Sequence, residues 1–498
     1  MPTPITASML YDLVQCPHRM TMDLFGDRSR RDSVSPFVEL LWERGQAFEK
    51  EVIDKLAIPF TNLRPYAAEE KERLTREAIS RGDALIYAGR ISADDLLGDP
   101  DLLRHQDNGY VAGDIKSGAG EEGATEDTEG KPKKHYAVQL ALYTDILERL
   151  GVSAAPTPFV WDIHGEEVVY DLAATQGTRN PTTLWNIYQE CLASARLITA
   201  KSEPTLPALI SDCKLCHWRT VCRDELERSD DLTLIPELGR AKRDALMPHV
   251  RTVEELASLD VGALIRGSKT LIPGVGVDTL KKFQARAQLR KLSDGKPYLR
   301  EQVSLPGAPI ELFFDIETDP MRDICYLHGF VCRRQGETET EQYYSFFATA
   351  PNPEEEKKAF ADAWSFVSAS APSVIYYYSP YERTIWRKLQ QKYPGVISEG
   401  EIEALFAPGA AVDLYHGVIR SKTEWPTSDY SVKTLASKLG FSWRDSDPSG
   451  AASIEWYHRW TETGDQTIQR RILEYNEDDC RAMRVLLEGV RRLPIRST

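Results

Sequence analysis

Four cysteines have a spacing that could bind a metal or a cluster. Cys16 lies near the N-terminus, and Cys213, Cys216 and Cys222 follow far downstream with the spacing C-x2-C-x5-C. The first residues, MPTPITASML, lack the basic start and apolar stretch of a secretory signal, so we expect reduced thiols rather than disulfides. Four thiolates could hold either zinc or an iron–sulfur cluster. Either would join the two ends of the segment between them.

That segment contains residues that could activate water. Asp114 and Lys116 in GYVAGDIKSG are two residues apart, so on a strand both side chains project from one face. The carboxylate could hold a divalent metal while the ammonium positions or activates water. Asp101 in GDPDLLR adds a second carboxylate, and Gln139 and Tyr143, four residues apart, would share one face of a helix. An isolated Asp-x-Lys pair is usually an ordinary part of a strand, so this prediction depends on the order of all these residues.

A second set of acidic residues lies in the C-terminal part of the chain. Asp315 and Glu317 in FFDIETD alternate on an apolar strand, where two unneutralised carboxylates would be costly. A metal between them removes that cost. Tyr475 and Asp479 in EYNEDDC are four residues apart on a predicted helix, which places a hydroxyl beside a carboxylate. Asp478 is an alternative to Asp479, although the spacing from the tyrosine favours Asp479.

Length and composition limit the class of protein. A chain of 498 residues is expected to form several domains, and 42% hydrophobic with 28% charged residues is ordinary for a soluble globular protein. No apolar run approaches the roughly 20 residues that span a bilayer, so we expect a cytoplasmic protein without membrane contact. The net charge of −15 argues against a wholly electrostatic binder of nucleic acid. It does not exclude a metal-dependent nuclease.

Four stretches differ in their patterns. Residues 1–230 mix helical and β-rich segments, and within them the Gly- and Glu-rich stretch 118–134 predicts a mobile surface loop. Residues 231–292 are predicted to be helical, and 293–309 to be a linker. In 310–498 apolar strands alternate with helical periodicity, which favours an α/β domain with a mixed sheet. We therefore expect an α/β multidomain protein with a small helical domain.

The helical stretch contains two similar segments, IPELGRAK and IPGVGVDTLKK, which resemble helix-hairpin-helix elements. In that motif a Gly-x-Gly turn directs backbone N–H groups at a DNA phosphate. Gly274 and Gly276 fit the turn, and Lys281 and Lys282 add positive charge. The first segment has Gly239 alone. A helical spacer without DNA contact is an equal alternative, and any contact made here would be independent of sequence.

The N-terminal motifs resemble the RecB-like branch of the PD-(D/E)xK nucleases. That branch pairs G-x-P-D, D-x-K and Q-x3-Y motifs in this order, and some members carry a 4Fe–4S cluster on one early cysteine and a late C-x2-C-x5-C. The resemblance implies a restriction-endonuclease-like fold and catalytic roles for the residues found at these motifs: Asp101, Asp114, Lys116, Gln139 and Tyr143. It also favours the cluster over zinc.

One motif departs from this family. These nucleases often have a metal-binding histidine after a glycine on an early helix, whereas this chain reads RGQAFEKE. Either Phe48 occupies the position of the histidine or Glu49 replaces it as an oxygen ligand. Full activity of this site is therefore in question.

The C-terminal motifs resemble the DEDD exonucleases with the RNase H-like fold, in the subgroup that has a tyrosine before the last aspartate. The resemblance implies that Asp315, Glu317 and Asp479 bind two divalent ions and that Tyr475 orients the attacking water. The second motif of that family brings an aspartate after an asparagine. Here the corresponding acid is Glu382, with a serine at the position of the asparagine. The later Asp413 is a fourth acid or a structural residue, and we favour the structural role.

The whole chain resembles the RecB-like nuclease family in which an iron–sulfur nuclease domain precedes an RNase H-like exonuclease domain. This implies a hydrolase that cleaves phosphodiester bonds with Mg²⁺ or Mn²⁺, on DNA rather than RNA, in DNA repair, recombination or CRISPR-type DNA processing. One alternative is an RNA 3′-to-5′ exonuclease that works through the C-terminal domain, and another is a catalytically idle scaffold that binds nucleic acid. The sequence has no G-x4-GK[ST] phosphate loop, so unwinding would need a partner such as a helicase.

Overall fold

The computed structural model describes residues 3–123, 130–177, 181–292 and 295–496. By its internal contacts the chain divides into an N-terminal unit, Met1–Pro207 with Ser211–Cys222, and a C-terminal unit, Ala208–Ile210 with Arg223–Thr498. No helix in the described ranges is long and apolar enough to cross a membrane.

The N-terminal unit is built around a six-stranded mixed sheet with the strand order β11-β10-β7-β6-β3-β2. Strand β7 pairs antiparallel with β6 and parallel with β10. The strands of the unit are β1 (Ile5–Thr6), β2 (Thr61–Asn62), β3 (Leu85–Tyr87), β4 (Ile91–Ala93), β5 (Leu96–Gly98), β6 (Leu102–Gln106), β7 (Gly109–Ile115), β8 (Glu121–Glu122), β9 (Lys131–Pro132), β10 (Phe159–Trp161), β11 (Glu167–Val169), β12 (Thr175–Gln176) and β13 (Thr182–Thr183). The helices are α1 (Ala7–Gln15), α2 (Pro17–Phe25), α3 (Pro36–Asp54), α4 (Ala68–Arg81), α5 (Lys134–Arg149), α6 (Leu184–Thr199) and the start of α7 (Arg219–Arg228). In the predicted loop 118–134, β8 pairs with β9, and residues 124–129 lie outside the described residues.

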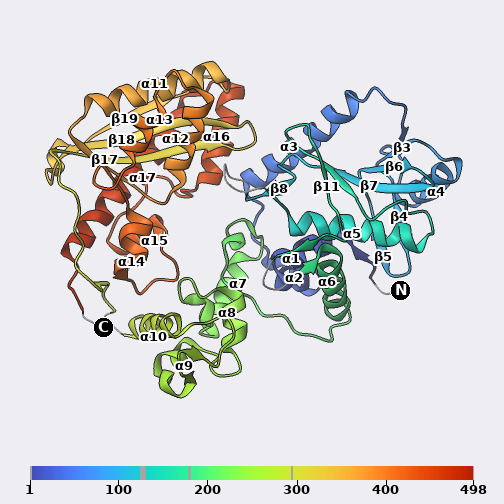
Figure 1. The fold of residues 1–498 in the computed structure, drawn as a ribbon, viewed down its shortest axis with the longest axis horizontal. Helices are drawn as coiled ribbons and strands as arrows, with labels where there is room; N and C mark the ends of the chain where they lie inside the picture. The colour runs from blue at the N-terminus through green and yellow to red at the C-terminus, as the bar shows by residue number, and fades with distance from the viewer. Residues whose placement is uncertain (1–2, 124–129, 178–180, 293–294, 497–498) are drawn as a thin grey trace. The chain divides into compact units, whose positions relative to one another are not determined.

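Both faces of this sheet are covered by helices (Figure 1). Tyr110 and Ala112 of β7 pack in the large cluster that includes α1, α5 and α6. Val111 and Ile115 pack in the smaller cluster on the other face, which includes residues of α3. Because side chains alternate along a strand, Asp114 projects to the same face as Ala112, toward α5.

The C-terminal unit begins with a small helical region. Its helices are α8 (Gly239–Leu246), α9 (Val253–Ser258) and α10 (Val277–Lys291), with the short strands β14 (Ile265–Arg266) and β15 (Lys269–Thr270). These elements share one apolar cluster, which includes Leu246, Leu256 and Phe283. The predicted all-helical stretch 231–292 therefore holds, apart from one short hairpin.

The predicted linker 293–309 is not a free connection in the structure. Its residues 293–294 lie outside the described residues, but Tyr298–Leu299 form strand β16, which pairs with β22 (Thr423–Glu424). Leu299 is buried in the core of the C-terminal domain. The stretch therefore adds a strand and an apolar side chain to that domain, which the turn-rich composition did not indicate.

The C-terminal domain has a five-stranded mixed sheet with the order β19-β18-β17-β20-β21, as the alternating pattern of 310–498 predicted. Its strands are β17 (Ile310–Asp319), β18 (Ile324–Arg334), β19 (Gln342–Phe347), β20 (Ser373–Tyr377) and β21 (Ala411–Asp413). Its helices are α11 (Pro353–Ala369), α12 (Tyr381–Lys392), α13 (Glu399–Leu405), α14 (Arg420–Lys422), α15 (Val432–Lys438), α16 (Gly450–Thr463) and α17 (Gln466–Arg492).

Helix α11 lies along one face of this sheet and α17 along the other (Figure 1). Leu312, Phe314 and Ile316 of β17 pack on the side of α11 and α12. Phe313 packs on the opposite side, in the cluster that contains α17. Asp315 and Glu317 share the parity of Phe313, so β17 presents both carboxylates to α17.

Candidate functional site

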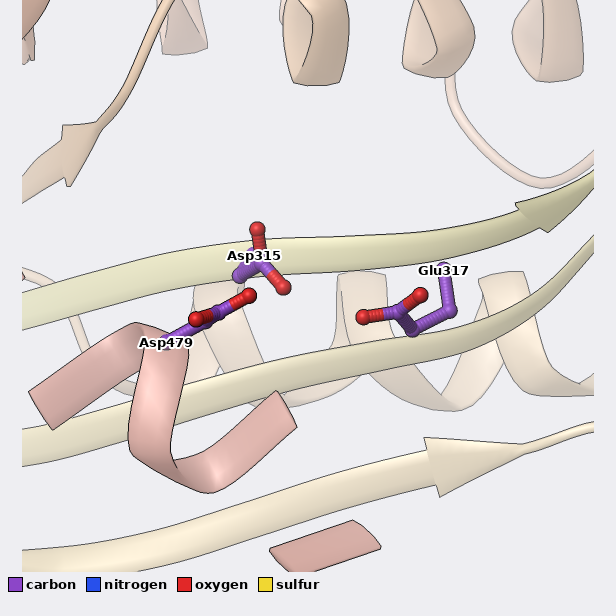
Figure 2. Close-up of side chains that lie close together, drawn as sticks. All are labelled: Asp315, Glu317 and Asp479. Carbon is purple, nitrogen blue, oxygen red and sulfur yellow. The ribbon is translucent and has the colours of Figure 1, made fainter. Parts of the chain in front are cut away.

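Three carboxylates meet between β17 and α17. One oxygen each of Asp315, Glu317 and Asp479 lies within 4.8 Å of the others, and no other group of three His, Cys, Asp or Glu ligand atoms in the described residues is as close. Figure 2 shows Asp315 and Glu317 on the strand with their carboxylates turned toward Asp479 on the helix. Oxygen ligands in this arrangement suit Mg²⁺ or Mn²⁺.

The electrostatics of this group fit a bound cation. Burial and the charges of Asp479, Glu317 and Glu382 raise the pKa of Asp315 well above its ordinary value. Burial and Asp479 likewise raise the pKa of Glu317 to about 8. Carboxylates this close repel one another when ionised, and a divalent ion would supply the missing positive charge.

Asn476 holds Asp315 in place. Its Nδ2 donates to Asp315 Oδ2 at 2.8 Å, while its Oδ1 accepts from the hydroxyl of Tyr343 at 2.8 Å. A Cβ at Gly329 would lie only 1.6 Å from Asn476 Oδ1, so the glycine on β18 makes room for the amide. Sequence reasoning missed Asn476, although a polar residue with low helix propensity next to a functional tyrosine is a usable signal.

Asp479 and Tyr475 have partners that sequence reasoning also missed. Lys433 Nζ lies 3.0 Å from the Tyr475 hydroxyl and 3.1 and 3.0 Å from the two carboxylate oxygens of Asp479. Trp443 Nε1 donates to Asp479 Oδ1 at 2.7 Å. Both partners lie far from these residues in the sequence, so local spacing gives no signal for them.

Glu382 lies close to the three carboxylates but outside their group. It is in the first turn of α12, is 4% exposed, and its Oε2 has no hydrogen-bond partner within the described ranges. Burial raises its pKa well above the ordinary value. Asp413 accepts hydrogen bonds from the backbone N–H groups of Ser379 and His416 at 3.1 and 3.0 Å, and this geometry supports a structural role for Asp413.

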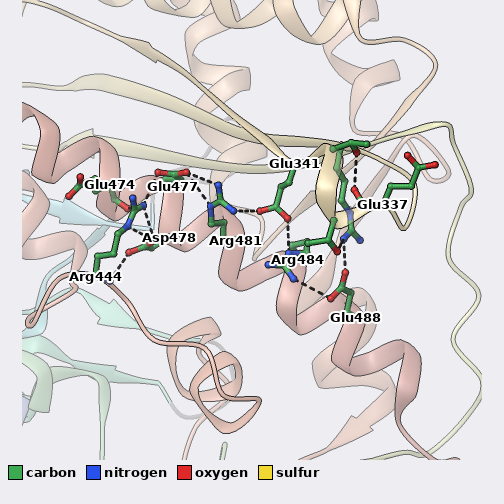
Figure 3. Close-up of polar contacts among 12 residues, drawn as sticks. Glu337, Glu341, Arg444, Glu474, Glu477, Asp478, Arg481, Arg484 and Glu488 are labelled. Atoms are coloured by element: carbon green, nitrogen blue, oxygen red, sulfur yellow. Dashed lines mark hydrogen bonds and ion pairs between the residues drawn. The ribbon is translucent and has the colours of Figure 1, made fainter.

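The neighbouring Asp478 faces away from the carboxylate group. Its oxygens accept from the backbone N and the Nε of Arg444 at 2.8 and 2.9 Å. These contacts begin a row of ion pairs along α17, in which Arg481 and Arg484 bind Glu341 (Figure 3). The row ties α17 to the segments beside it and so fixes the rotation of the helix that carries Tyr475 and Asp479.

A second set of acidic residues lies in the N-terminal unit, at the end of β7. Lys116 Nζ is 2.8 Å from Asp114 Oδ2. Asp101 accepts from the backbone N–H of Ile115 at 2.9 Å, and its own N–H donates to Asp114 Oδ1 at 3.4 Å. Burial and the charge of Asp114 raise the pKa of Asp101 to about 7. The structure therefore brings together Asp101, Asp114 and Lys116.

Helix α5 carries Tyr143, and Gln139 lies one turn earlier on the same helix. The hydroxyl of Tyr143 donates to the backbone oxygen of Asp99, two residues before Asp101, at 3.5 Å, and burial together with the charges of Asp114 and Asp101 raises the pKa of Tyr143 well above its ordinary value. A Cβ at Gly98 would lie 2.6 Å from Tyr143 Cδ1, so the glycine of the GDPD segment is needed for the ring to fit. Gln139 Oε1 is buried and has no hydrogen-bond partner in the part of the chain that is described.

Of the two residues that could replace the missing histidine, Glu49 faces the site. Its Oε1 accepts from the hydroxyl of Tyr87 and from Arg64, both at 2.8 Å. Its charge also helps to raise the pKa of Asp101. Phe48 instead packs in the apolar cluster under α3. This geometry favours an oxygen ligand at the position of the histidine.

The four cysteines lie in the N-terminal unit as reduced thiols that are neither fully buried nor fully exposed. Cys16 separates α1 from α2, and the others lie at the C-terminal end of the unit. Burial and, to a smaller extent, Cys213 and Cys16 raise the pKa of Cys216. Within the described ranges they do not form a group as close as that of Asp315.

The helical region provides one exposed glycine turn. Gly274 has a φ of +73° and no atom within 4 Å of a Cβ position, and Lys281 is exposed. In the first segment Glu237 takes a similar φ of +65° at the position of Gly274. Lys282 does not face solvent freely, since its Nζ lies 3.1 Å from Glu237 Oε2. Of the two predicted lysines, Lys281 is therefore the one available to a phosphate.

Comparison with known proteins finds a nuclease superfamily for each of the two regions that contain these residues. The PD-(D/E)XK nuclease superfamily matches residues 21–223, and the RNase_H superfamily matches residues 312–490. No curated protein matches the chain. The chain therefore has a domain of the PD-(D/E)XK nuclease superfamily followed by a domain of the RNase_H superfamily, and together these two domains indicate a metal-dependent nuclease.

Proposed function

We propose that the protein removes nucleotides from the ends of DNA, with the C-terminal carboxylate group as its exonuclease site. The observation that carries this proposal is the meeting of Asp315, Glu317 and Asp479 within 4.8 Å, with the hydroxyl of Tyr475 beside them. Mg²⁺ or Mn²⁺ held by these residues would supply an activated water and stabilise the leaving oxygen. Asn476 keeps one carboxylate oriented for that task.

Tyr475 retains its proton in this site. Burial and the charge of Asp479 raise its pKa well above the ordinary value, and the side chain is only 3% exposed. A protonated phenol beside the carboxylates can donate a hydrogen bond to the attacking water or to a phosphate oxygen. This supports its role as the group that orients water.

We propose a second hydrolytic site at Asp101 and Asp114, with Glu49 as a third oxygen ligand. Burial alone would lower the pKa of Lys116, but the charges of Asp114 and Asp101 outweigh burial and raise it. Lys116 therefore stays protonated and acts on the water or the phosphate through its charge rather than as a general base. Tyr143 and Gln139 line the site from α5.

The four cysteines would hold a 4Fe–4S cluster that closes the N-terminal unit. Sulfur ligands suit iron–sulfur clusters as well as zinc. The N–H of Trp218 donates to Cys216 Sγ at 3.5 Å, and such bonds stabilise thiolates. Anaerobic purification followed by absorption spectroscopy and analysis of iron, sulfide and zinc tests this part: iron and sulfide are expected, and zinc alone would refute the cluster.

DNA is favoured as the substrate by the helical region. The exposed turn at Gly274 lies just before α10 (Val277–Lys291), and Lys281 is in the first turns of that helix. Backbone N–H groups at such a position can bind a phosphate independently of base sequence. Unwinding would come from a partner such as a helicase in DNA repair, recombination or CRISPR-type processing.

The test is cleavage of end-labelled single- and double-stranded DNA and RNA with Mg²⁺ or Mn²⁺. The full chain is compared with Asp114→Ala, Asp315→Ala and the double variant. Asp362→Ala, which removes an exposed carboxylate on α11, is the matched control. We expect mononucleotides from DNA, lost with Asp315→Ala and retained with Asp362→Ala.

Other results of this assay would favour a different function. Preference for RNA that depends on Asp315 would indicate an RNA exonuclease. Binding without any product, unchanged by either substitution, would indicate a nucleic-acid-binding scaffold. Products that disappear only with Asp114→Ala would assign cleavage to the N-terminal site.

A further inference from the structure

A lysine to which the proposed chemistry assigns no role lies inside the C-terminal carboxylate group. Lys433 is the second residue of α15 (Val432–Lys438). This helix precedes α17, which carries Tyr475 and Asp479, in the sequence. The ammonium of Lys433 is within hydrogen-bond distance of both carboxylate oxygens of Asp479 and of the Tyr475 hydroxyl. The side chains of Lys433 and Asp479 are 32% and 10% exposed, so the pair is half-buried and accessible to solvent from one side.

The charge of Lys433 extends over the whole group. Its positive charge offsets part of the rise in pKa that burial and the neighbouring carboxylates cause at Asp315 and Glu317. The ammonium also lies 4.8 Å from the centre of the Tyr475 ring and 5.5 Å from that of Trp443. Both rings attract the ammonium through cation–π contacts.

The hydrogen bonds of Lys433 determine which oxygen of Asp479 can bind an ion and where the hydroxyl hydrogen of Tyr475 can point. Asp479 Oδ1 accepts from both Lys433 and Trp443, and a carboxylate oxygen has two lone pairs. Oδ2 accepts from Lys433 but not from Trp443, which donates to Oδ1, so Oδ2 is the oxygen better placed to bind an ion. An ammonium can only donate, so the Tyr475 oxygen accepts from Lys433 and its own O–H must point elsewhere.

We propose that Lys433 is a positioning residue of the C-terminal site, which holds the Tyr475 hydroxyl so that its O–H is directed at the attacking water. The same ammonium competes with the divalent ion for the negative charge of Asp479. This inference rests on the proposed hydrolytic function of that site. It assigns Lys433 two effects of opposite sign: support of the chemical step and opposition to metal binding.

These two effects separate a positioning role from a structural one. Lys433→Met keeps the length of the side chain but removes its charge. Metal affinity should then rise by about three- to tenfold, because a repelling charge is gone. The value of kcat should fall by about 10- to 100-fold, the effect expected for losing a hydrogen bond from a charged donor. If Lys433 had a purely structural role, Lys433→Met would lower both the metal affinity and kcat.

The experiment uses the full chain with Asp114→Ala, so that cleavage reports the C-terminal site. Mn²⁺ binding is measured by titration calorimetry, and kcat on a single-stranded oligonucleotide at saturating Mn²⁺. Lys433→Met is compared with Lys433→Arg, which keeps the charge, and with Lys438→Met, which changes an exposed lysine of the same helix. Tyr475→Phe is combined with Lys433→Met in a double-mutant cycle.

Tighter Mn²⁺ binding with a lower kcat in Lys433→Met, near-wild-type affinity in Lys433→Arg and no change in Lys438→Met would support the inference. In the cycle, the double variant should be no slower than the slower single variant, since both changes remove one function. Weaker Mn²⁺ binding, an unchanged kcat or fully multiplicative losses would overturn it. If Asp114→Ala alone abolishes cleavage, the proposed function of the C-terminal site fails instead, and the calorimetry shows whether Lys433 still opposes the ion.

Discussion

Replacing Glu317 with glutamine should stabilise the metal-free protein at neutral pH, although it removes an expected metal ligand. Burial and the carboxylate of Asp479 raise the pKa of Glu317 from 4.5 to about 8. Because the folded pKa lies above the unfolded one, the folded protein keeps a proton that the unfolded chain releases. The contribution of Glu317 to the free energy of unfolding is therefore fully present below about pH 4.5 and is lost as the pH rises toward 8.

The size of this effect follows from the two pKa values. At pH 7 the unfolded carboxyl is about 2.5 pH units above its pKa, and each unit corresponds to about 1.36 kcal/mol. The folded protein therefore loses about 3 kcal/mol of stability between pH 4.5 and pH 7. Glutamine cannot ionise and avoids this loss. For domains of about 150–250 residues, 3 kcal/mol corresponds to an increase in Tm of about 6–12 °C.

The assay is thermal unfolding of the full chain in a chelator between pH 5 and pH 8.5. Glu317→Gln is compared with the wild type and with Glu339→Gln, which changes an exposed glutamate in the same domain. The transition of the C-terminal unit is identified as the one whose shift by added Mg²⁺ is lost with Asp315→Ala. We expect a higher Tm for Glu317→Gln at pH 7.5 and a difference that shrinks toward pH 5. Equal Tm values for Glu317→Gln and Glu339→Gln at pH 7.5 would refute the reasoning.

Three further changes test other parts of the structure. Gly98→Ala would place a Cβ 2.6 Å from the Tyr143 ring, so cleavage that depends on the N-terminal site should fall at least tenfold while circular dichroism stays unchanged. Cys213→Ser should lower the iron content of anaerobically purified protein and the Tm of the N-terminal unit, whereas an unchanged iron content would exclude this thiol as a ligand. Glu341→Gln removes the charge of the buried partner of Arg481. Because Arg481 keeps its ion pair with Glu477, the free energy of unfolding should fall by only about 1–2 kcal/mol in urea titrations. No measurable loss would show that the pair behaves as a surface ion pair.

The parts of the sites that depend on local periodicity could be predicted from the sequence. Asp315 and Glu317 share a face because strand side chains alternate, and Tyr475 and Asp479 share a face because they are four apart on a helix. The pattern of apolar residues around each pair predicted a strand for the first pair and a helix for the second. The same rule placed Asp114 on the face of its strand that packs against α5.

The remaining partners could not be predicted, because tertiary packing brings them in from distant segments. Lys433 and Trp443 reach Asp479 across 46 and 36 residues of sequence. Asn476 is adjacent to Tyr475, but its task depends on the space that Gly329 leaves on β18. The strand at Tyr298–Leu299 was missed for the same reason: its pairing partner lies more than a hundred residues away, so its own composition indicated only a linker.

The two sites place a lysine beside a carboxylate in different ways, and this difference has a consequence for metal binding. Lys116 follows Asp114 on one strand and lies 2.8 Å from it, so backbone geometry fixes the pair. Lys433 reaches Asp479 only through the packing of α15 against α17, so this pair depends on tertiary structure. The C-terminal site also gathers more carboxylates around its lysine. Its metal-free state is therefore the more strained of the two, and divalent metal should stabilise the C-terminal unit more than the N-terminal one.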